Sequence, residues 1–184
     1  MSGKVLHIFI ASNAGEPMQE VRKVGAIEQL GLEGDRYTGE RGISSKLKYG
    51  ISGHVSLIEQ EAIDRVSNQS PTPFLPEDTR RNIVVKNFPL NGLVGKEFMV
   101  WGVKMMGVEL CHPCKRPSEL SGKQGFKELF SGFGGLRAEI LTSGVLYVGA
   151  NISRDIVKCL ICHTTTSYPH VCPEFYPALH WNHL

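Results

Sequence analysis

The sequence predicts a mainly β fold, a β-barrel or rolled sheet with a few short helices. Three observations carry this prediction. Five segments are rich in Val, Ile and Phe and are bounded by Gly or Pro, as strands usually are. Twenty glycines are spread through the chain, many at positions where turns are expected. The segments do not alternate regularly with long helical patterns, which disfavours a doubly wound nucleotide-binding fold.

The predicted elements follow one another along most of the chain. The strand segments are 4–11, 21–29, 82–85, 97–110 and 136–148. A helix is predicted to begin at Ser56, because Glu59 three residues later completes a capping box. Its apolar face would carry Ile58, Ala62, Ile63 and Val66, and residues 67–69 would end it. A second short helix is predicted over residues 126–130, whose Phe and Leu side chains would pack onto the barrel.

Size and charge limit what the chain is expected to do. Its 184 residues, 41% hydrophobic and 21% charged, are typical of one globular domain, predicted here over residues 1–154. The formal net charge is +2 and no long basic run occurs, so no nucleic-acid partner is expected. Residues 155–184 show no strand alternation. They would form a disordered tail or a segment that docks through its aromatic side chains.

The chain shows no targeting pattern. Its first eleven residues are too short and too poorly flanked for a signal peptide, and no run reaches the roughly 18 apolar residues of a membrane span. We therefore expect a cytoplasmic protein without a membrane partner. In that compartment the five cysteines stay reduced, and their odd number and uneven spacing favour metal-binding or catalytic roles over disulfides.

The segment Cys111–Arg116 is the leading candidate for chemistry. A thiol acts as a nucleophile or soft-metal ligand as thiolate, and neighbouring cations lower its pKa. Lys115 and Arg116 supply such cations, and Pro113 restrains the backbone directly before Cys114. The alternative interpretation is a half-buried pair of small side chains at a strand end.

Three further clusters carry arginine. Asp35-Arg36, behind a glycine turn, is typical of a surface ion pair. Arg80 and Arg81 enter a predicted strand, where adjacent side chains point to opposite faces, so one would turn inward and need an anion. That anion could be Asp78, Asp35 or a phosphate held by the guanidinium fork. The third cluster, residues 132–137, is a glycine-rich turn ending at Arg137, whose amides could approach a phosphate or could simply form a tight hairpin entry.

A zinc site is an alternative use of the cysteines. Cys111/Cys114 and Cys159/Cys162 are two Cys-x-x-Cys pairs, as tetrathiolate sites require, but their separation is far longer than the roughly 15 to 20 residues of a compact zinc ribbon. Residues 159–163 also match the c-type haem attachment pattern. That attachment needs an export route, for which the N-terminus gives no indication.

Taken together and in order, the motifs resemble the MOSC domain family, named for the C-terminal part of molybdenum cofactor sulfurases. The resembling segments are 31–36 (GLEGDR), 55–59 (VSLIE), 80–85 (RRNIVV), 91–98 (NGLVGKEF), 111–115 (CHPCK), 134–138 (GGLRA) and 147–149 (YVG). Their shared order covers about 150 residues. The resemblance implies a β-barrel of the pyruvate-kinase-barrel type with a few short helices.

The resemblance also implies a site. In the molybdenum members the cysteine directly after the proline, here Cys114, is the thiolate ligand of the metal, and basic residues hold the phosphate of the pterin, molybdopterin. The candidate cofactor-binding residues are Arg36, Arg80, Arg81, Lys115 and Arg137, with Asn82 as a hydrogen-bonding partner. Members that use pyridoxal phosphate carry it on an aminotransferase-like domain, so this chain is not expected to hold it covalently. The hypothesis requires Cys114 and these arginines to line one pocket.

Two functions follow from this site. The first is a molybdenum-dependent oxidoreductase that reduces N-hydroxylated substrates with electrons from a separate reductase. The second is a sulfur carrier that receives a persulfide on Cys114 from a cysteine desulfurase and binds no metal itself. A binding module that retains the barrel without chemistry is the remaining alternative.

Overall fold

The computed structural model describes residues 2–38, 54–154, 157–158 and 165–166. Seven strands form a closed barrel in the order β11, β7, β8, β9, β5, β6, β1, and β11 pairs with β1 to close it. The barrel strands are β1 (Ser2–Ile10), β5 (Val55–Glu59), β6 (Ile83–Lys86), β7 (Glu97–Val100), β8 (Val103–Leu110), β9 (Leu136–Ile140) and β11 (Asn151–Ser153). Within it, β5 and β6 pair in parallel and the other described pairs are antiparallel. The predicted fold class is confirmed.

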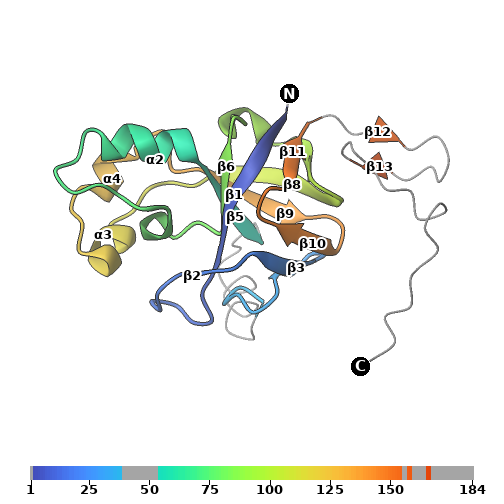
Figure 1. Ribbon diagram of the computed structural model, residues 1–184, viewed down its shortest axis with the longest axis horizontal. Helices are drawn as coiled ribbons and strands as arrows, with labels where there is room; N and C mark the ends of the chain where they lie inside the picture. The colour runs from blue at the N-terminus through green and yellow to red at the C-terminus, as the bar shows by residue number, and fades with distance from the viewer. Residues whose placement is uncertain (1, 39–53, 155–156, 159–164, 167–184) are drawn as a thin grey trace.

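Smaller elements surround the barrel (Figure 1). Strand β2 (Gln19–Glu20) pairs antiparallel with the end of β1, and β10 (Gly144–Tyr147), β3 (Lys23–Ile27) and β4 (Gly31–Leu32) form a separate three-stranded sheet. The helices are α2 (Gln60–Ser67), α3 (Arg116–Ser121) and α4 (Phe126–Leu129), with the 3₁₀ turns η1 (Pro76–Thr79) and η2 (Asn91–Leu93). Figure 1 shows the three α-helices together on one side of the barrel. No helix in the described residues is long and apolar enough to cross a membrane.

Strand alternation divides the buried side chains between two clusters. Leu57 of β5 and Ile83 of β6 point into the barrel, whereas their neighbours Ile58 and Val84 point outward. The barrel interior is filled by side chains from its strands, and Val24 and Leu146 of the three-stranded sheet pack against the same cluster. Outside the barrel, Ile58 and Val84 pack with helix α2 and with four buried phenylalanines, Phe9, Phe74, Phe126 and Phe130. We call this second group the aromatic cluster.

The strand predictions agree with the structure, with two differences in extent. Segment 97–110 is a hairpin, β7 and β8, which turns at Trp101, where φ is 55°. Segment 136–148 contains β9 and β10, which belong to different sheets. Apolar content alone did not show these breaks. The second predicted helix is confirmed as α4.

The predicted start of the first helix is wrong. Residues 55–59 form β5, and α2 begins only at Gln60. Ser56 pairs with Arg137 of β9 and its hydroxyl donates to Asn82 Oδ1 (2.8 Å), so it caps no helix. Glu59 instead accepts a hydrogen bond from the Leu90 amide (2.6 Å). Because β5 pairs with a strand on each side, its backbone N–H and C=O groups form sheet hydrogen bonds, and these outweigh the local capping pattern that predicted a helix.

The separate domain boundary at 154/155 stays a prediction. Most of residues 155–184, including Cys159, Cys162, His163 and Cys172, lie outside the described residues. Within the described part, β12 (Val157–Lys158) pairs antiparallel with β13 (Thr165–Thr166).

Candidate functional site

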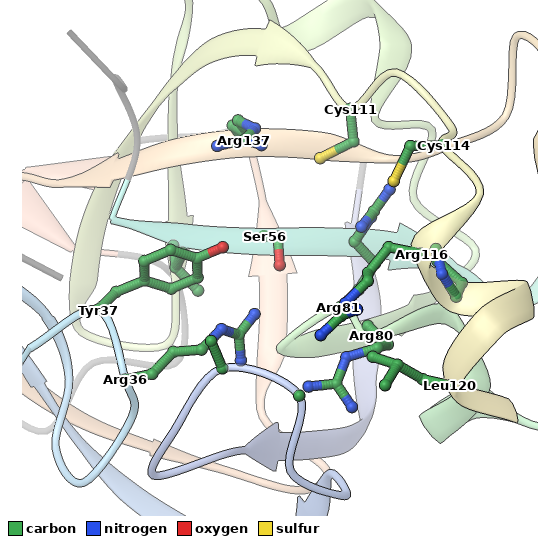
Figure 2. Close-up of a pocket in the computed structure, with 14 residues that line it drawn as sticks. Arg36, Tyr37, Ser56, Arg80, Arg81, Cys111, Cys114, Arg116, Leu120 and Arg137 are labelled. Carbon is green, nitrogen blue, oxygen red and sulfur yellow. The ribbon is translucent and has the colours of Figure 1, made fainter. Parts of the chain in front are cut away.

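A cavity of about 230 Å³ lies beside the paired residues Ser56 of β5 and Arg137 of β9 (Figure 2). Five arginines and two cysteines line it, with a few small or apolar residues. The lining residues are Ala14, Gly15, Arg36, Tyr37, Val55, Ser56, Arg80, Arg81, Cys111, Cys114, Arg116, Pro117, Leu120 and Arg137. None of these described residues carries a carboxylate. The cavity therefore presents strong positive charge to whatever enters it.

The arginines reach the cavity from separate parts of the chain. Arg36 follows β4, Arg80 and Arg81 precede β6, Arg116 begins α3, and Arg137 lies in β9. Figure 2 shows their side chains around one opening, with the two cysteines on one side. Cys114, Arg36, Arg80, Arg81 and Arg137 were all predicted from the sequence, and the structure brings these five together.

Nearby carboxylates neutralise the positive charge of the five cavity arginines only in part. Arg36 lies 3.6 Å from Asp35, Arg116 lies 3.5 Å from Glu119, and Arg137 lies 3.4 Å from Glu109, all at or beyond hydrogen-bonding distance. Arg80 and Arg81 donate to backbone carbonyls instead, of Glu16 (2.7 Å) and Gly134 (2.8 Å). The proposed partner Asp78 is held by Lys123. An anion bound in the cavity would supply the missing negative charge.

The expectation that Arg80 and Arg81 point to opposite faces is wrong. Arg80 ends the η1 turn in the left-handed conformation (φ 59°), and strand β6 begins only at Ile83. The strand rule therefore does not apply to this pair, and both side chains line the cavity. Burial lowers the pKa of Arg80, and the positive charges of Arg36 and Arg116 lower it further. Such crowding of cations favours a bound anion.

The two thiols of the loop differ in exposure. Cys114 is exposed at the cavity, whereas Cys111 is buried, at 4% exposure. Burial raises the pKa of Cys111, and the nearby Arg81 and Arg137 oppose that rise. Cys114 is therefore the thiol that is open to a ligand, and Cys111 lies behind it in the wall.

The glycine-rich turn holds the cysteine loop in place. A Cβ on Gly134 would collide with the Cys111 carbonyl, and a Cβ on Gly135 (φ 95°) would collide with the Leu57 carbonyl. The Cys111 amide donates to the Gly135 carbonyl (2.7 Å), and Arg81 donates to that of Gly134. Close packing against the Cys111 and Leu57 carbonyls therefore accounts for these two glycines.

Two buried polar residues position Arg36. Asp35 is 3% exposed, so the surface ion pair expected for Asp35-Arg36 is wrong. Its carboxylate accepts from the amides of Ala11 and Tyr37 (3.1 Å each) and from the Asn82 amide group (3.2 Å). Asn82 also accepts from Ser56, in β5. These bonds join four segments and fix the turn that carries Arg36, whose guanidinium lies 4.5 Å from the Tyr37 ring centre.

Two predicted residues do not line the cavity. Asn82 is buried beneath it, where its role is the bonding just described. Lys115 is exposed and lines a neighbouring hollow with Ser118 and Glu119 of α3. Sequence reasoning missed Ser56, which it assigned to a helix cap, and the Ala14-Gly15 turn, which carries no local signal. Tyr37 adjoins the predicted Arg36, and Arg116 was expected as a cation beside the thiol but not as a phosphate contact.

The zinc hypothesis gains no support in the described residues. They contain no group of three or more His, Cys, Asp or Glu side chains that could hold a metal ion. The second Cys-x-x-Cys pair, Cys159 and Cys162, lies outside them.

Comparisons with known proteins agree with the architecture. The family model of the MOSC domain matches residues 44–153. Among solved structures, YuaD from Bacillus subtilis superimposes with a TM-score of 0.68 at 20% identity, over 83% of this chain and 94% of that one. YiiM from Geobacillus stearothermophilus (TM-score 0.61, 13% identity, 82% and 73% covered) and YiiM from Escherichia coli (0.62, 15%, 85% and 72%) share the fold. A search of curated proteins gives no match.

Proposed function

This chain belongs to the MOSC domain family, and from that premise we propose that it binds the molybdenum cofactor in the arginine-lined cavity and reduces N-hydroxylated substrates. The family is associated with this cofactor. The proposed substrates are hydroxylamino bases and amidoximes. A separate reductase would supply the electrons, in the cytoplasm, without a nucleic-acid or membrane partner.

One observation carries the proposal: an exposed thiol, Cys114, stands at a cavity lined by five arginines and by no described carboxylate. The donor set fits the two chemical parts of the cofactor. A thiolate is a ligand that soft metal centres prefer, and guanidinium groups bind phosphate through paired N–H donors. Cys114 would bind the molybdenum, and Arg36, Arg80, Arg81 and Arg137 would hold the phosphate of the pterin.

When bound, the cofactor supplies the redox chemistry that side chains lack. The residues of this chain bind and orient it. The Gly134 carbonyl fixes the Arg81 guanidinium, and Asp35 fixes the turn that carries Arg36. Asn82 acts through Asp35 as a positioning residue, and the exposed Lys115 adds positive charge beside Cys114.

The test is to produce the protein in a host that makes the cofactor and to measure bound molybdenum and pterin fluorescence. We expect wild type to carry both and Cys114→Ser to lose the metal. Arg81→Gln should lose pterin as well, whereas Arg22→Gln, an exposed arginine that does not line the cavity, should retain it. Wild type purified without molybdenum would overturn the proposal.

A second candidate function is favoured by the exposure of Cys114 and by the buried thiol near it. Cys114 would accept a sulfane sulfur from a cysteine desulfurase and pass it to a metal centre or cofactor elsewhere. In Cys111→Ala, which lacks the second thiol of the cavity, incubation with a desulfurase and cysteine should add about 32 Da to Cys114, an addition that further replacement by Cys114→Ser prevents. An unmodified Cys114 under these conditions would exclude this function.

A further inference from the structure

The proposed functions use Cys114 and leave Cys111 without a task. Cys111 is the other cysteine of the described residues, and it lines the same cavity. Figure 2 shows both sulfur atoms on the cavity side of the loop that joins β8 to α3. A buried structural cysteine would turn its sulfur into the apolar core. Cys111 instead lines the cavity that Arg81 and Arg137 also line.

Two cations lie near Cys111. Burial raises the pKa of its thiol and Glu109 raises it further, whereas the guanidinium groups of Arg81 and Arg137 lower it. Arg137 and Arg81 are held in turn by β9 and by the Gly134 carbonyl. The cations would therefore stabilise negative charge that forms on the Cys111 sulfur during a reaction.

The loop fixes one thiol and leaves the other accessible. Cys111 is anchored by the hydrogen bond that its backbone amide donates to the Gly135 carbonyl and by the close approach of its own carbonyl to Gly134. Cys114 is exposed and lies in neither a helix nor a strand. Residues three apart can approach within about 7 Å across a turn, which is near the limit of Cα separation in disulfides. Because Cys111 is anchored and Cys114 is exposed, Cys114 is the thiol that can adjust when a disulfide forms.

We propose that Cys111 is a resolving thiol for groups bound through sulfur to Cys114. The Cys111 thiolate attacks the Cys114 sulfur, the bond between that sulfur and its substituent breaks, and a Cys111–Cys114 disulfide forms. The substituent leaves with the electron pair of the broken bond, as hydrosulfide from a persulfide or as glutathione thiolate from a mixed disulfide, and is protonated. Both cysteine sulfurs finish at the disulfide level, and the departing sulfur is reduced. A dithiol reductant would restore the pair.

This inference deepens the sulfur-carrier candidate, on which its persulfide form rests, but its glutathione form needs no other part of the proposed function. In this role the buried Cys111 thiol removes the sulfur-bound substituent from Cys114. It also gives the cavity a closed state, because Cys114 in a disulfide has no free thiolate to offer a metal.

The experiment treats the reduced full-length chain with oxidised glutathione and maps the cysteines by mass spectrometry. Trypsin cleaves after Lys104 and Lys115, so both thiols fall in the peptide 105–115, which contains no other cysteine. We expect this peptide from wild type to become about 2 Da lighter, as a disulfide does. From Cys111→Ser it should become about 305 Da heavier, as glutathione stays on Cys114. A glutathione adduct on the wild-type peptide equal to that of the variant would overturn the proposal.

Cys111→Ala is tested beside Cys111→Ser, because a hydroxyl at a buried site can itself destabilise the fold. Circular dichroism checks that both variants are folded, and both should keep the adduct.

A second arm uses a cysteine desulfurase with cysteine in place of oxidised glutathione. Wild type should release hydrosulfide and form the disulfide, and Cys111→Ala should retain about 32 Da on Cys114. A stable persulfide on wild-type Cys114 would overturn the resolving role and leave the carrier function standing. If neither protein acquires sulfur, the carrier function fails, and the glutathione arm still decides the role of Cys111.

Discussion

Strand β5 contributes to two regions of opposite character. Val55 and Ser56 at its start line the arginine-lined cavity, whereas Ile58 near its end packs into the aromatic cluster. In the aromatic cluster, Phe126 and Phe130 stack at 4.3 Å between ring centres, and Phe74 meets both edge-on. In the cavity, cations stand close together with few carboxylate partners.

The aromatic cluster and the arginine-lined cavity contribute to different properties of the protein, folding stability and anion binding. Burial of large apolar side chains stabilises the fold by about 1.5–3 kcal/mol for each. Crowded guanidinium groups repel one another and gain little until an anion binds. The aromatic cluster should therefore govern stability, and the cavity should govern binding. Substitutions in the two regions can separate these effects.

The largest effect is expected for Phe126→Ala. The ring is fully buried and contacts two others, and its removal should lower the free energy of unfolding by about 3–5 kcal/mol. Urea denaturation followed by circular dichroism measures the loss, and Phe126→Leu should lose less because it leaves a smaller cavity. A loss below about 1 kcal/mol for the alanine variant would show that the aromatic cluster does not govern stability.

Asn82→Ala should affect both regions, because Asn82 joins β5, β1 and the Asp35 turn. Leaving buried partners unpaired should cost about 1–3 kcal/mol of unfolding free energy. Phosphate binding should weaken too, since Arg36 loses its fixed position. Denaturation and phosphate titration are compared with Asn91→Ala, an exposed asparagine. Unchanged phosphate affinity would show that the Asp35 turn does not depend on Asn82.

Arg80→Gln should alter binding with little change in stability. We expect affinity for inorganic phosphate to fall about tenfold or more, since a charged hydrogen bond contributes about 1.5–3 kcal/mol. The unfolding free energy should stay within about 0.5 kcal/mol of wild type, because the side chain is half-buried and adjoins other cations. Calorimetry at fixed ionic strength measures affinity, with Arg22→Gln as control. A large loss of stability would assign Arg80 a structural role instead.

The smallest effect on the free energy of unfolding is expected for substitution of Glu59, at the end of β5. Burial raises its pKa above 4.5, Glu61 raises it further, and the hydrogen bond from Leu90 opposes the rise. The folded state therefore holds the proton more tightly than the unfolded state. Stability from this group is fully present below about pH 4.5 and is lost as pH rises through the folded pKa.

Glu59→Gln should remove this pH dependence and retain an acceptor for the Leu90 amide. Relative to wild type, the variant should gain stability between about pH 4.5 and neutral pH, and denaturation at pH 4 and pH 7 measures the difference. A variant that loses stability only at pH 7 would show that the ionised carboxylate is favoured at this position.

Some features of the site could be predicted from the sequence and others could not. Cys114 and four of the arginines were predicted from motifs, because thiol and guanidinium chemistry belongs to the residue itself. Ser56 was misplaced in a helix, since a capping box is a local pattern that strand pairing on both sides overrode. Arg80 and Arg81 were given opposite faces, because the left-handed turn at Arg80 was invisible in the strand pattern.

The strand-rich fold class, the order of the family's motifs and the thiol among basic residues could all be inferred from the amino-acid sequence. These depend on side-chain chemistry and on local preference, which are present before folding. Folding, by contrast, brings five arginines to one cavity, buries Asp35, and places Cys111 in the cavity wall while Cys114 stays exposed. Burial and proximity arise from contacts between segments far apart in the chain, and closure of the barrel sets those contacts.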